Sequence, residues 1–277
     1  MEGGYGYEAI YEALKEGGIE AKEGHPIKIK AIGYARIKTD RIDAKILADL
    51  TRSKLLPEAY VVSRGVRRIR ELCRERKKVV EERTKWKNRI RSIIEKEGIE
   101  VGVKNLWTRR GEVWLKGLGI KRIERGLKMI EVLDRCIEEI EKEIEEASKE
   151  IMEEREILMS IPRIGKYSAS MITGEIGDID RFEDAEKLAS YAGLVPRIEQ
   201  TGEKKRMGGI TKEGSKYLRW ILVEVVQQHV NRYESKISEF YRRVAERRGR
   251  KREIMAAARK LLVVIYYMLK RRERFRG

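Results

Sequence analysis

Two carboxylates stand three residues apart in the segment KTDRIDA at residues 38–44. If a helix begins near Thr39, Asp40 and Asp43 lie on one face, with Cβ atoms about 5–6 Å apart. Two acids that close repel each other unless a cation lies between them, and their hard oxygen ligands suit Mg²⁺. The alternative is a helix start that Asp40 caps while Asp43 complements the helix dipole. Spacing alone favours this second interpretation.

A second candidate site lies between Leu158 and Leu222, which joins a glycine-containing turn to a basic loop. The sequence IPRIG at 161–165, which includes Arg163, is similar to the turn of a helix-hairpin-helix, where backbone N–H groups face a phosphate. A polar, glycine-rich loop follows, with a helix expected to start near Ser215. Its predicted phosphate-binding cations are Lys204, Lys205, Arg206, Lys212, Lys216 and Arg219. A solvated surface explains the same residues equally well.

Composition favours a polyanionic partner. The 277 residues carry 63 basic and 46 acidic side chains, a formal net charge of +17, and each phosphate that such a surface neutralises releases counterions. A highly charged helical protein without such a partner is the alternative.

The longest apolar run, 261–269, is shorter than the ~20 residues of a membrane span, and no signal pattern opens the chain. Cys73 and Cys136 are interpreted as core thiols of a cytoplasmic protein.

The elements expected to position these sites are long helices. Apolar residues recur every seven positions at Leu72, Val79, Trp86 and Ile93, and again from Ile123 through Ile151. These heptads predict two antiparallel arms joined by a glycine-rich connection at 98–120. A hairpin that packs on itself is one interpretation, and a coiled coil that forms a dimer is the favoured one. A basic run at 247–252 leads into an amphipathic closing helix at 254–262.

Several motifs occur together in a specific order: IPRIG (161–165), IGDIDRF (176–182), LASYAGLVP (188–196), TG (201–202) and GGITKEG (208–214). In sequence and order they resemble the C-terminal domain of the insertion sequence 110 family of transposases, over roughly a hundred residues. KTDRIDA resembles the motif that carries the last two acids of this family's Asp-Glu-Asp-Asp metal site. In the same comparison Glu2 falls on the family's second acid.

The resemblance implies a mainly helical chain with a small α/β part. Residues 1–62 would be a partial RuvC-like (ribonuclease-H-like) domain, 63–155 the coiled-coil dimerisation arms, and 156–277 a helical domain with a helix-hairpin-helix-like element. It further implies a DNA transposase or recombinase that acts with Mg²⁺ held by Glu2, Asp40 and Asp43. Lys38 and the basic loop would contact nucleic acid, a structured guide RNA would supply sequence choice, and a homodimer or higher oligomer would form.

Two departures from the family pattern accompany this resemblance. The family's first acid is expected on an opening strand some tens of residues before the position of Glu2, whereas the sequence begins at Met1. We expect either that the reading frame was assigned from an internal methionine or that the sequence is a decayed copy of a mobile element. Thr201 stands where the family has its nucleophilic serine; it is still an alcohol, but its methyl group restricts χ1. A turn-forming Thr-Gly pair is the alternative interpretation. The hypotheses are thus a recombinase or a catalytically silent, nucleic-acid-binding remnant.

Overall fold

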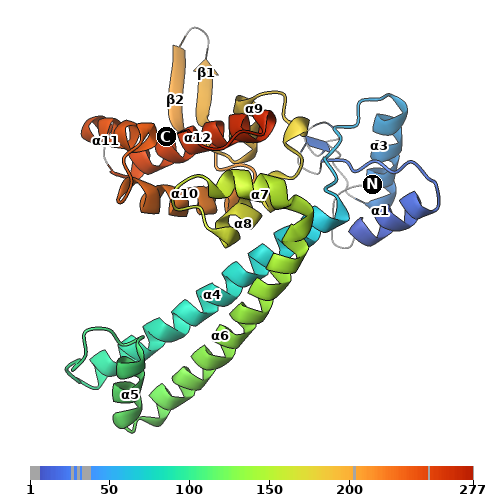
Figure 1. Ribbon diagram of the computed structural model, residues 1–277. Helices are drawn as coiled ribbons and strands as arrows, with labels where there is room; N and C mark the ends of the chain where they lie inside the picture. Colours follow the sequence, from blue (N-terminus) through green and yellow to red (C-terminus); the bar gives the residue numbers. More distant parts are fainter. Residues whose placement is uncertain are drawn as a thin grey trace. The chain divides into compact units, whose positions relative to one another are not determined.

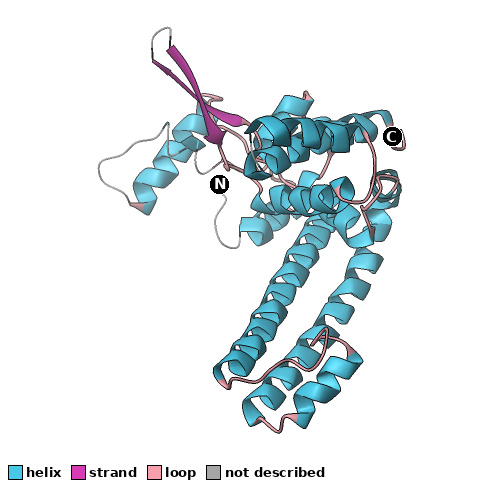
Figure 2. Ribbon diagram, turned by 90° about the vertical axis from the view of Figure 1, so that its left-hand side faces the viewer, coloured by secondary structure: helices cyan, strands magenta, loops and turns pink. Residues whose placement is uncertain are grey.

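The computed structural model describes residues 7–25, 28–29, 32, 39–201, 204–248 and 250–276, and it divides the chain into two compact units, 1–62 and 63–277. Helices dominate the described residues, and one two-stranded sheet is present in the second unit (Figure 2). The predicted arms and the predicted C-terminal domain therefore belong to the same compact unit.

The first unit contains helices α1 (Tyr7–Glu16) and α3 (Asp40–Arg52). A small apolar cluster of Ile29, Leu50 and Leu56 lies within it. The predicted α/β character is limited, among the described residues of this unit, to an isolated antiparallel bridge between Gly24 and Glu58.

The second unit begins with two long helices, α4 (Arg64–Lys96) and α6 (Lys121–Ala147), which pack side by side as an antiparallel hairpin (Figure 1). The predicted heptad row on α6 is buried, from Ile123 through Ile130, Ile137 and Ile144. Much of this row therefore packs against the chain's own other arm. Gly126 allows close approach of the helices, since an added Cβ there would lie 3.0 Å from a side-chain carbon of Ile90.

The connection between the arms contains a helix that the sequence analysis missed, α5 (Arg109–Gly117). It packs at the far end of the arms and forms a second apolar core (Figure 1). The buried members of this core are Ile90, Ile94, Leu106, Leu115, Ile123 and Ile130. The glycines that predicted an irregular connection act at its turns, because Gly98 and Gly119 adopt positive φ angles of 66° and 65° after α4 and α5.

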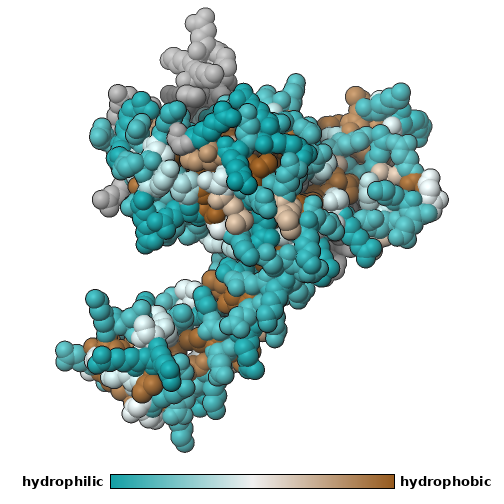
Figure 3. All heavy atoms as spheres, in the orientation of Figure 1, coloured by the Kyte–Doolittle hydropathy of each residue, from teal (hydrophilic) through white to brown (hydrophobic). Residues whose placement is uncertain are grey.

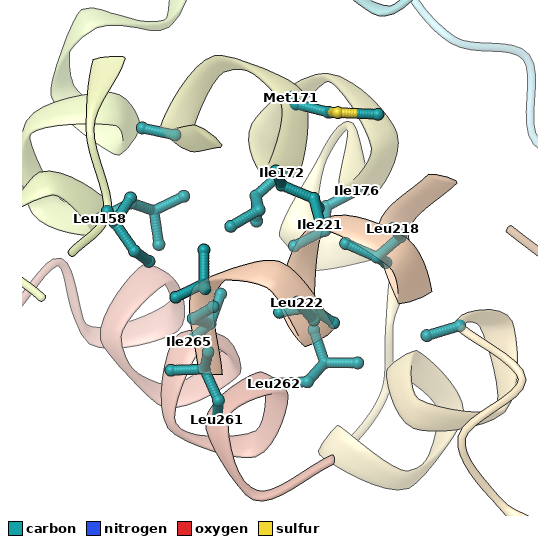
Figure 4. Close-up of a cluster of buried hydrophobic side chains, with 14 of the residues drawn as sticks. Leu158, Met171, Ile172, Ile176, Leu218, Ile221, Leu222, Leu261, Leu262 and Ile265 are labelled. Carbon is teal, nitrogen blue, oxygen red and sulfur yellow. The ribbon is translucent and has the colours of Figure 1, made fainter. Parts of the chain in front are cut away.

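The remaining helices form a bundle at the other end of the arms. They are η1 (Ser148–Ile151), α7 (Met152–Met159), α8 (Lys166–Ile176), η2 (Ile179–Arg181), α9 (Ala185–Tyr191), α10 (Lys216–Val230), α11 (Lys236–Arg248) and α12 (Arg250–Arg271). Figure 4 shows their shared core, to which α8 contributes Ile172, α10 Leu222 and α12 Leu261. The predicted closing helix is confirmed as part of α12, whose apolar face is buried here.

An antiparallel hairpin of strands β1 (Pro196–Thr201) and β2 (Lys204–Ile210) projects from this bundle (Figure 1). The prediction of a loop was wrong for 204–210. Thr201 pairs with Lys204, and the register is irregular between Pro196 and Ile198. No helix within the described residues is long and apolar enough to cross a membrane.

The two thiols of the second unit should differ in reactivity. Burial raises the pKa of the Cys73 thiol to about 12, whereas Cys136 is only half-buried. Because the thiolate is the nucleophile, iodoacetamide at pH 8 should modify Cys136 in the native protein and reach Cys73 only after denaturation. Peptide mass spectrometry of native and urea-treated samples measures both rates. Equal native rates would contradict the burial of Cys73.

Candidate nucleic-acid interface and catalytic residues

The paired acids lie at the start of α3, as predicted. Thr39 is the N-cap, and its side chain accepts a hydrogen bond from the backbone N–H of Ile42 at 3.3 Å. The capping role proposed for Asp40 therefore belongs to Thr39. Asp40 is exposed and Asp43 is half-buried in the first turn, and neither carboxylate has a hydrogen-bond partner among the described side chains.

Glu2 and Lys38, which the sequence analysis placed with these acids, lie outside the described residues. Within the part of the chain that is described, no group of three or more His, Cys, Asp or Glu side chains could hold a metal ion. The described contribution to a metal site is therefore the pair Asp40 and Asp43, which occupies adjacent positions on one turn of helix.

The IPRIG turn lies between α7 and α8. Arg163 is exposed and adopts a left-handed backbone with φ of 78°, an uncommon conformation for a residue with a side chain. Buried His229 holds the turn, because its Nδ1 lies 2.9 Å from the carbonyl oxygen of Pro162 and its Nε2 lies 2.7 Å from Ser235 Oγ. Gly165 is the N-cap of α8 and has no side chain to accept a hydrogen bond, so the first backbone N–H groups of α8 have no capping side chain.

Two glycines fix the base of the β1–β2 hairpin. Gly193 has φ of 64°, and a Cβ added there would lie 2.3 Å from the carbonyl oxygen of Glu213. Gly214 has φ of 99°, and its added Cβ would lie 2.1 Å from the carbonyl oxygen of Tyr191. The segments before β1 and after β2 can approach this closely only because both positions lack a side chain.

Strand β1 ends at Thr201, and β2 begins at Lys204, with which Thr201 pairs. The side chains of Thr201, Lys204, Lys205 and Arg206 lie outside the described part of the structure. Their backbone positions place all four at the end of the hairpin away from the glycines at its base.

The remaining predicted cations have different environments. Lys212 is exposed, with φ of 57° at the foot of β2, and Lys216 is exposed in the first turn of α10. Arg219 is half-buried, and its Nη1 donates a hydrogen bond of 2.8 Å to the carbonyl oxygen of Ala192. Burial lowers the pKa of Arg219. Arg219 thus supports the hairpin base, while Lys212 and Lys216 have side chains open to a ligand.

A buried carboxylate that the sequence analysis missed connects these pieces. Glu175 of α8 is 1% exposed, and it accepts two hydrogen bonds from the guanidinium of Arg74 on α4, at 2.6 and 2.9 Å. Ser215 Oγ donates a third bond of 2.7 Å. Ser215 also caps α10 by accepting from the N–H of Leu218, so the predicted helix start is confirmed, and the Ser215 hydroxyl is engaged in this network.

The backbone of the same helix end is held by two further side chains. Arg70 Nε donates to the carbonyl oxygen of Gly174 at 2.8 Å, and the Tyr191 hydroxyl donates to that of Glu175 at 3.1 Å. Elements from the arm, α8, α9 and the start of α10 therefore converge on one point. A glutamate among apolar residues in ASMITGEI was the available sequence signal.

The described geometry brings the IPRIG turn, the hairpin base and Glu175 into one unit, 63–277, while Asp40 and Asp43 belong to the unit 1–62. Comparison with known proteins connects both units to transposition. A model described as "Transposase IS116/IS110/IS902 family" matches residues 155–242. A second model, of the DEDD transposases of IS110 elements, matches residues 1–97.

Curated relatives agree with these matches. The chain is 29% identical, over 86% of its length, to the transposase for insertion sequence element IS1111A of Coxiella burnetii, and it spans 68% of that protein. It is also 29% identical, over 80% of its length, to the putative transposase y4qE of Sinorhizobium fredii, of which it spans 55%. A pilin gene-inverting protein of Moraxella bovis is 35% identical over 36% of the chain and 31% of its own length.

These matches define the class as a transposase of bacterial insertion sequences. The chain belongs to the IS116/IS110/IS902 transposase family.

The Glu175 contact should dominate the stability of the second unit. Arg74→Met would leave a buried carboxylate without its cation, which should lower the free energy of unfolding by on the order of 3 kcal/mol. Lys149→Met is the matched control, because it removes a cation from an exposed pair with Glu146 and should cost less than about 1 kcal/mol. Urea unfolding monitored by circular dichroism compares them. Similar losses in both variants would show that Glu175 does not depend on Arg74.

Proposed function

We propose that this chain is a DNA recombinase that cuts and rejoins DNA through a side-chain hydroxyl. Two transposase matches carry the proposal. One model matches residues 1–97, which include Asp40 and Asp43, and the other matches residues 155–242, which include the IPRIG turn and the hairpin. The net charge of +17 supports a polyanionic substrate.

In this proposal Thr201 supplies the attacking oxygen. The Thr201 oxygen forms a bond to phosphorus, the bond from that phosphorus to one DNA oxygen breaks, and the threonine proton passes to a base. The released DNA oxygen takes up a proton, and the DNA remains joined to the protein as a phosphothreonine ester. The reverse step, with a different DNA hydroxyl as attacker, would rejoin the strands.

The hairpin supports this role by its position. It carries Thr201 at its end, away from the bundle, while Gly193, Gly214 and Arg219 hold its base. Lys204, Lys205 and Arg206 follow Thr201 closely in sequence, and Lys212 and Lys216 are exposed at the foot of the hairpin. These cations would bind the phosphates of the DNA backbone and would stabilise the negative charge that develops on the attacked phosphate in the transition state. Arg163 and the uncapped start of α8 would provide a second phosphate contact.

Asp40 and Asp43, together with Glu2, would hold Mg²⁺. The described residues fit a hard cation, because two carboxylates lie one helical turn apart and neither is paired with a described side chain. A bound Mg²⁺ would polarise the scissile phosphate. The chain's own contribution is to keep both acids on the first turn of α3, where the Thr39 cap fixes the start of the helix.

A guide RNA and a dimer complete the proposal. Recognition of sequence by a paired RNA would leave the protein to contact phosphates, which fits the abundance of Lys and Arg. A dimer or higher oligomer would let one protomer's acids act with its partner's threonine. Because the buried rows of the arms pack within one chain, such contacts would use outer faces, where Val113 and Val132 are 67% and 44% exposed.

The nucleophile can be tested by trapping the phosphothreonine ester. Incubation with DNA and guide RNA of the parent element and with Mg²⁺ should give a covalent adduct that resists denaturing electrophoresis. Thr201→Ala should abolish this adduct, and Thr201→Ser should increase it because the smaller side chain removes the methyl group that crowds in-line attack. Thr211→Ala, just after β2, is the matched control and should retain it. DNA binding without any adduct would instead favour the silent, nucleic-acid-binding remnant.

The metal ligands can be tested without activity. Mn²⁺ is a paramagnetic substitute for Mg²⁺ at carboxylate sites, and its binding can be titrated by electron paramagnetic resonance. Asp40→Asn and Asp43→Asn should each weaken Mn²⁺ binding by about tenfold or more. Asp49→Asn, on the same helix and paired with Arg52, should have no effect. Equal Mn²⁺ affinity in all three variants would show that Asp40 and Asp43 are not metal ligands.

A further inference from the structure

Charge is distributed unevenly along the α4–α6 arms. Residues 131–146 of α6 contain eight acids and two bases, whereas residues 121–128 contain four bases and one acid. From the middle of the arms toward the bundle, cations of α4 pair with acids of α6: Arg83 contacts Asp134 at 2.6 Å, and Arg76 contacts Glu141 at 2.6 Å. The far end lacks such compensation, because residues 85–96 of α4 also contain five bases and one acid.

A groove lies between the two helices at this far end, on the surface of the hairpin. Its volume is about 650 Å³, within the range of ligand sites. Half-buried Trp86 and Ile93 and the 40% exposed Met129 provide its apolar lining. Five exposed cations surround it: Arg89, Lys96, Arg122, Arg125 and Lys128. Figure 3 shows hydrophobic side chains among hydrophilic ones at this end of the arms.

These cations have little compensation from the protein itself. Among the described residues, Arg122 has one distant acidic neighbour, Glu97 at 3.9 Å, and no salt bridge involves the other four. Arg89 instead lies over the Trp86 ring, 4.6 Å from its centroid. The groove lining contains no acidic residue. Five like charges around one concave surface attract a flexible polyanion.

We propose that this groove, hereafter the tip groove, binds a single strand of nucleic acid. Phosphodiester groups would lie against the five cations, while a base or sugar would contact Trp86 and Met129. Cations that follow the backbone, beside an aromatic ring that receives a base, are the combination that single strands require. The inference rests on the proposed function only in that the chain handles nucleic acid, and it adds a contact far along the arm from Thr201.

The charge makes a strand a better occupant than a second copy of this chain. A copy that docked its own arm tip here would bring another set of uncompensated cations against these five, at an electrostatic cost. An acidic stretch such as 131–146 would be more compatible, but several of its acids already pair with α4. Self-association through the tip groove is therefore the competing outcome that the experiment must separate.

The test uses the full chain and fluorescently labelled single-stranded RNA and DNA of equal length. The triple variant Arg122→Gln, Arg125→Gln, Lys128→Gln removes three cations from one side of the groove. Its matched control, Lys78→Gln, Arg135→Gln, Lys142→Gln, removes three exposed cations from the same arms outside the groove. Fluorescence anisotropy at several salt concentrations gives the dissociation constant and its salt dependence.

The groove variant should bind at least one of the two nucleic acids about tenfold more weakly at low salt. The slope of log affinity against log salt should fall by about 2, since each single-strand phosphate contact contributes about 0.7. The control should lose less than about threefold. A preference for RNA or DNA would identify which strand occupies the groove. Equal losses in both variants would overturn the proposal, because they would reflect net charge alone.

Crosslinking provides the positional readout. A photoreactive benzophenone side chain at position 92, within the groove lining, should crosslink to the bound strand, and the same group at position 142 should not. A crosslink from position 92 to a second protein chain, or none at all, would overturn the proposal. The result is independent of Thr201: strand binding here with no covalent adduct would reject the hydroxyl mechanism alone, and an adduct without groove binding would reject the tip groove alone.

Discussion

The second unit depends on the burial of one carboxylate. Glu175 lies 1% exposed at the end of α8, where an unpaired negative charge would be strongly unfavourable. Arg74 from the arm and Ser215 from the start of α10 neutralise and hydrogen-bond it. The arm cannot leave the bundle without exposing or unpairing this group. The contact therefore sets the direction from which the arm leaves the bundle and the position from which α10 begins.

Glu175 is also connected to the base of the hairpin, through neighbouring residues and hydrogen bonds. Ser215 follows Gly214 directly, and the backbone N–H of Ser215 donates a hydrogen bond to the carbonyl oxygen of Tyr191. The hydroxyl of Tyr191 in turn donates a hydrogen bond to the carbonyl oxygen of Glu175. The foot of β2 and the segment before β1 are thus held against the same helix end. Under the proposed mechanism such a rigid base would help to orient the Thr201 hydroxyl, because a misplaced attacking atom loses much of the benefit of orientation.

Sequence reasoning reached the elements whose signals are local. The start of α3 at Thr39, the start of α10 at Ser215 and the buried row from Ile123 follow from caps and heptads. Helix α5 was missed because Gly111 and Gly117 indicate an irregular connection, yet Gly111 is required there: an added Cβ would lie 2.4 Å from the carbonyl oxygen of Asn105. Helix formation at this point depends on packing against the arms, which composition does not reveal.

The missed strand and the missed ion pair have a common cause. β2 has little apolar alternation in KKRMGGI, so its structure depends on pairing with β1 and on the contacts at the hairpin base. Glu175 and Arg74 are 101 residues apart, and nothing local indicates that they meet. The roles of Glu2 and Thr201 could be proposed only through family resemblance, because a lone acid and a Thr-Gly pair carry no specific signal by themselves.

The arms show why heptad spacing alone does not decide between folding and association. A buried row satisfies the same pattern whether its partner is another chain or the other half of one hairpin. Here the row from Ile123 to Ile144 is buried within the chain, and at the tip the apolar core around Ile90 and Leu115 holds two helices whose surfaces both carry excess positive charge. Like charges three residues apart, such as those of Arg122 and Arg125 or of Arg125 and Lys128, weaken a helix. Acids at these positions would complement the helix dipole in the first turns of α6 and the basic facing residues 85–96 of α4, as the acids of α6 do for Arg76 and Arg83. Folding alone does not explain the cations at the tip, which is consistent with the proposed interaction outside the hairpin.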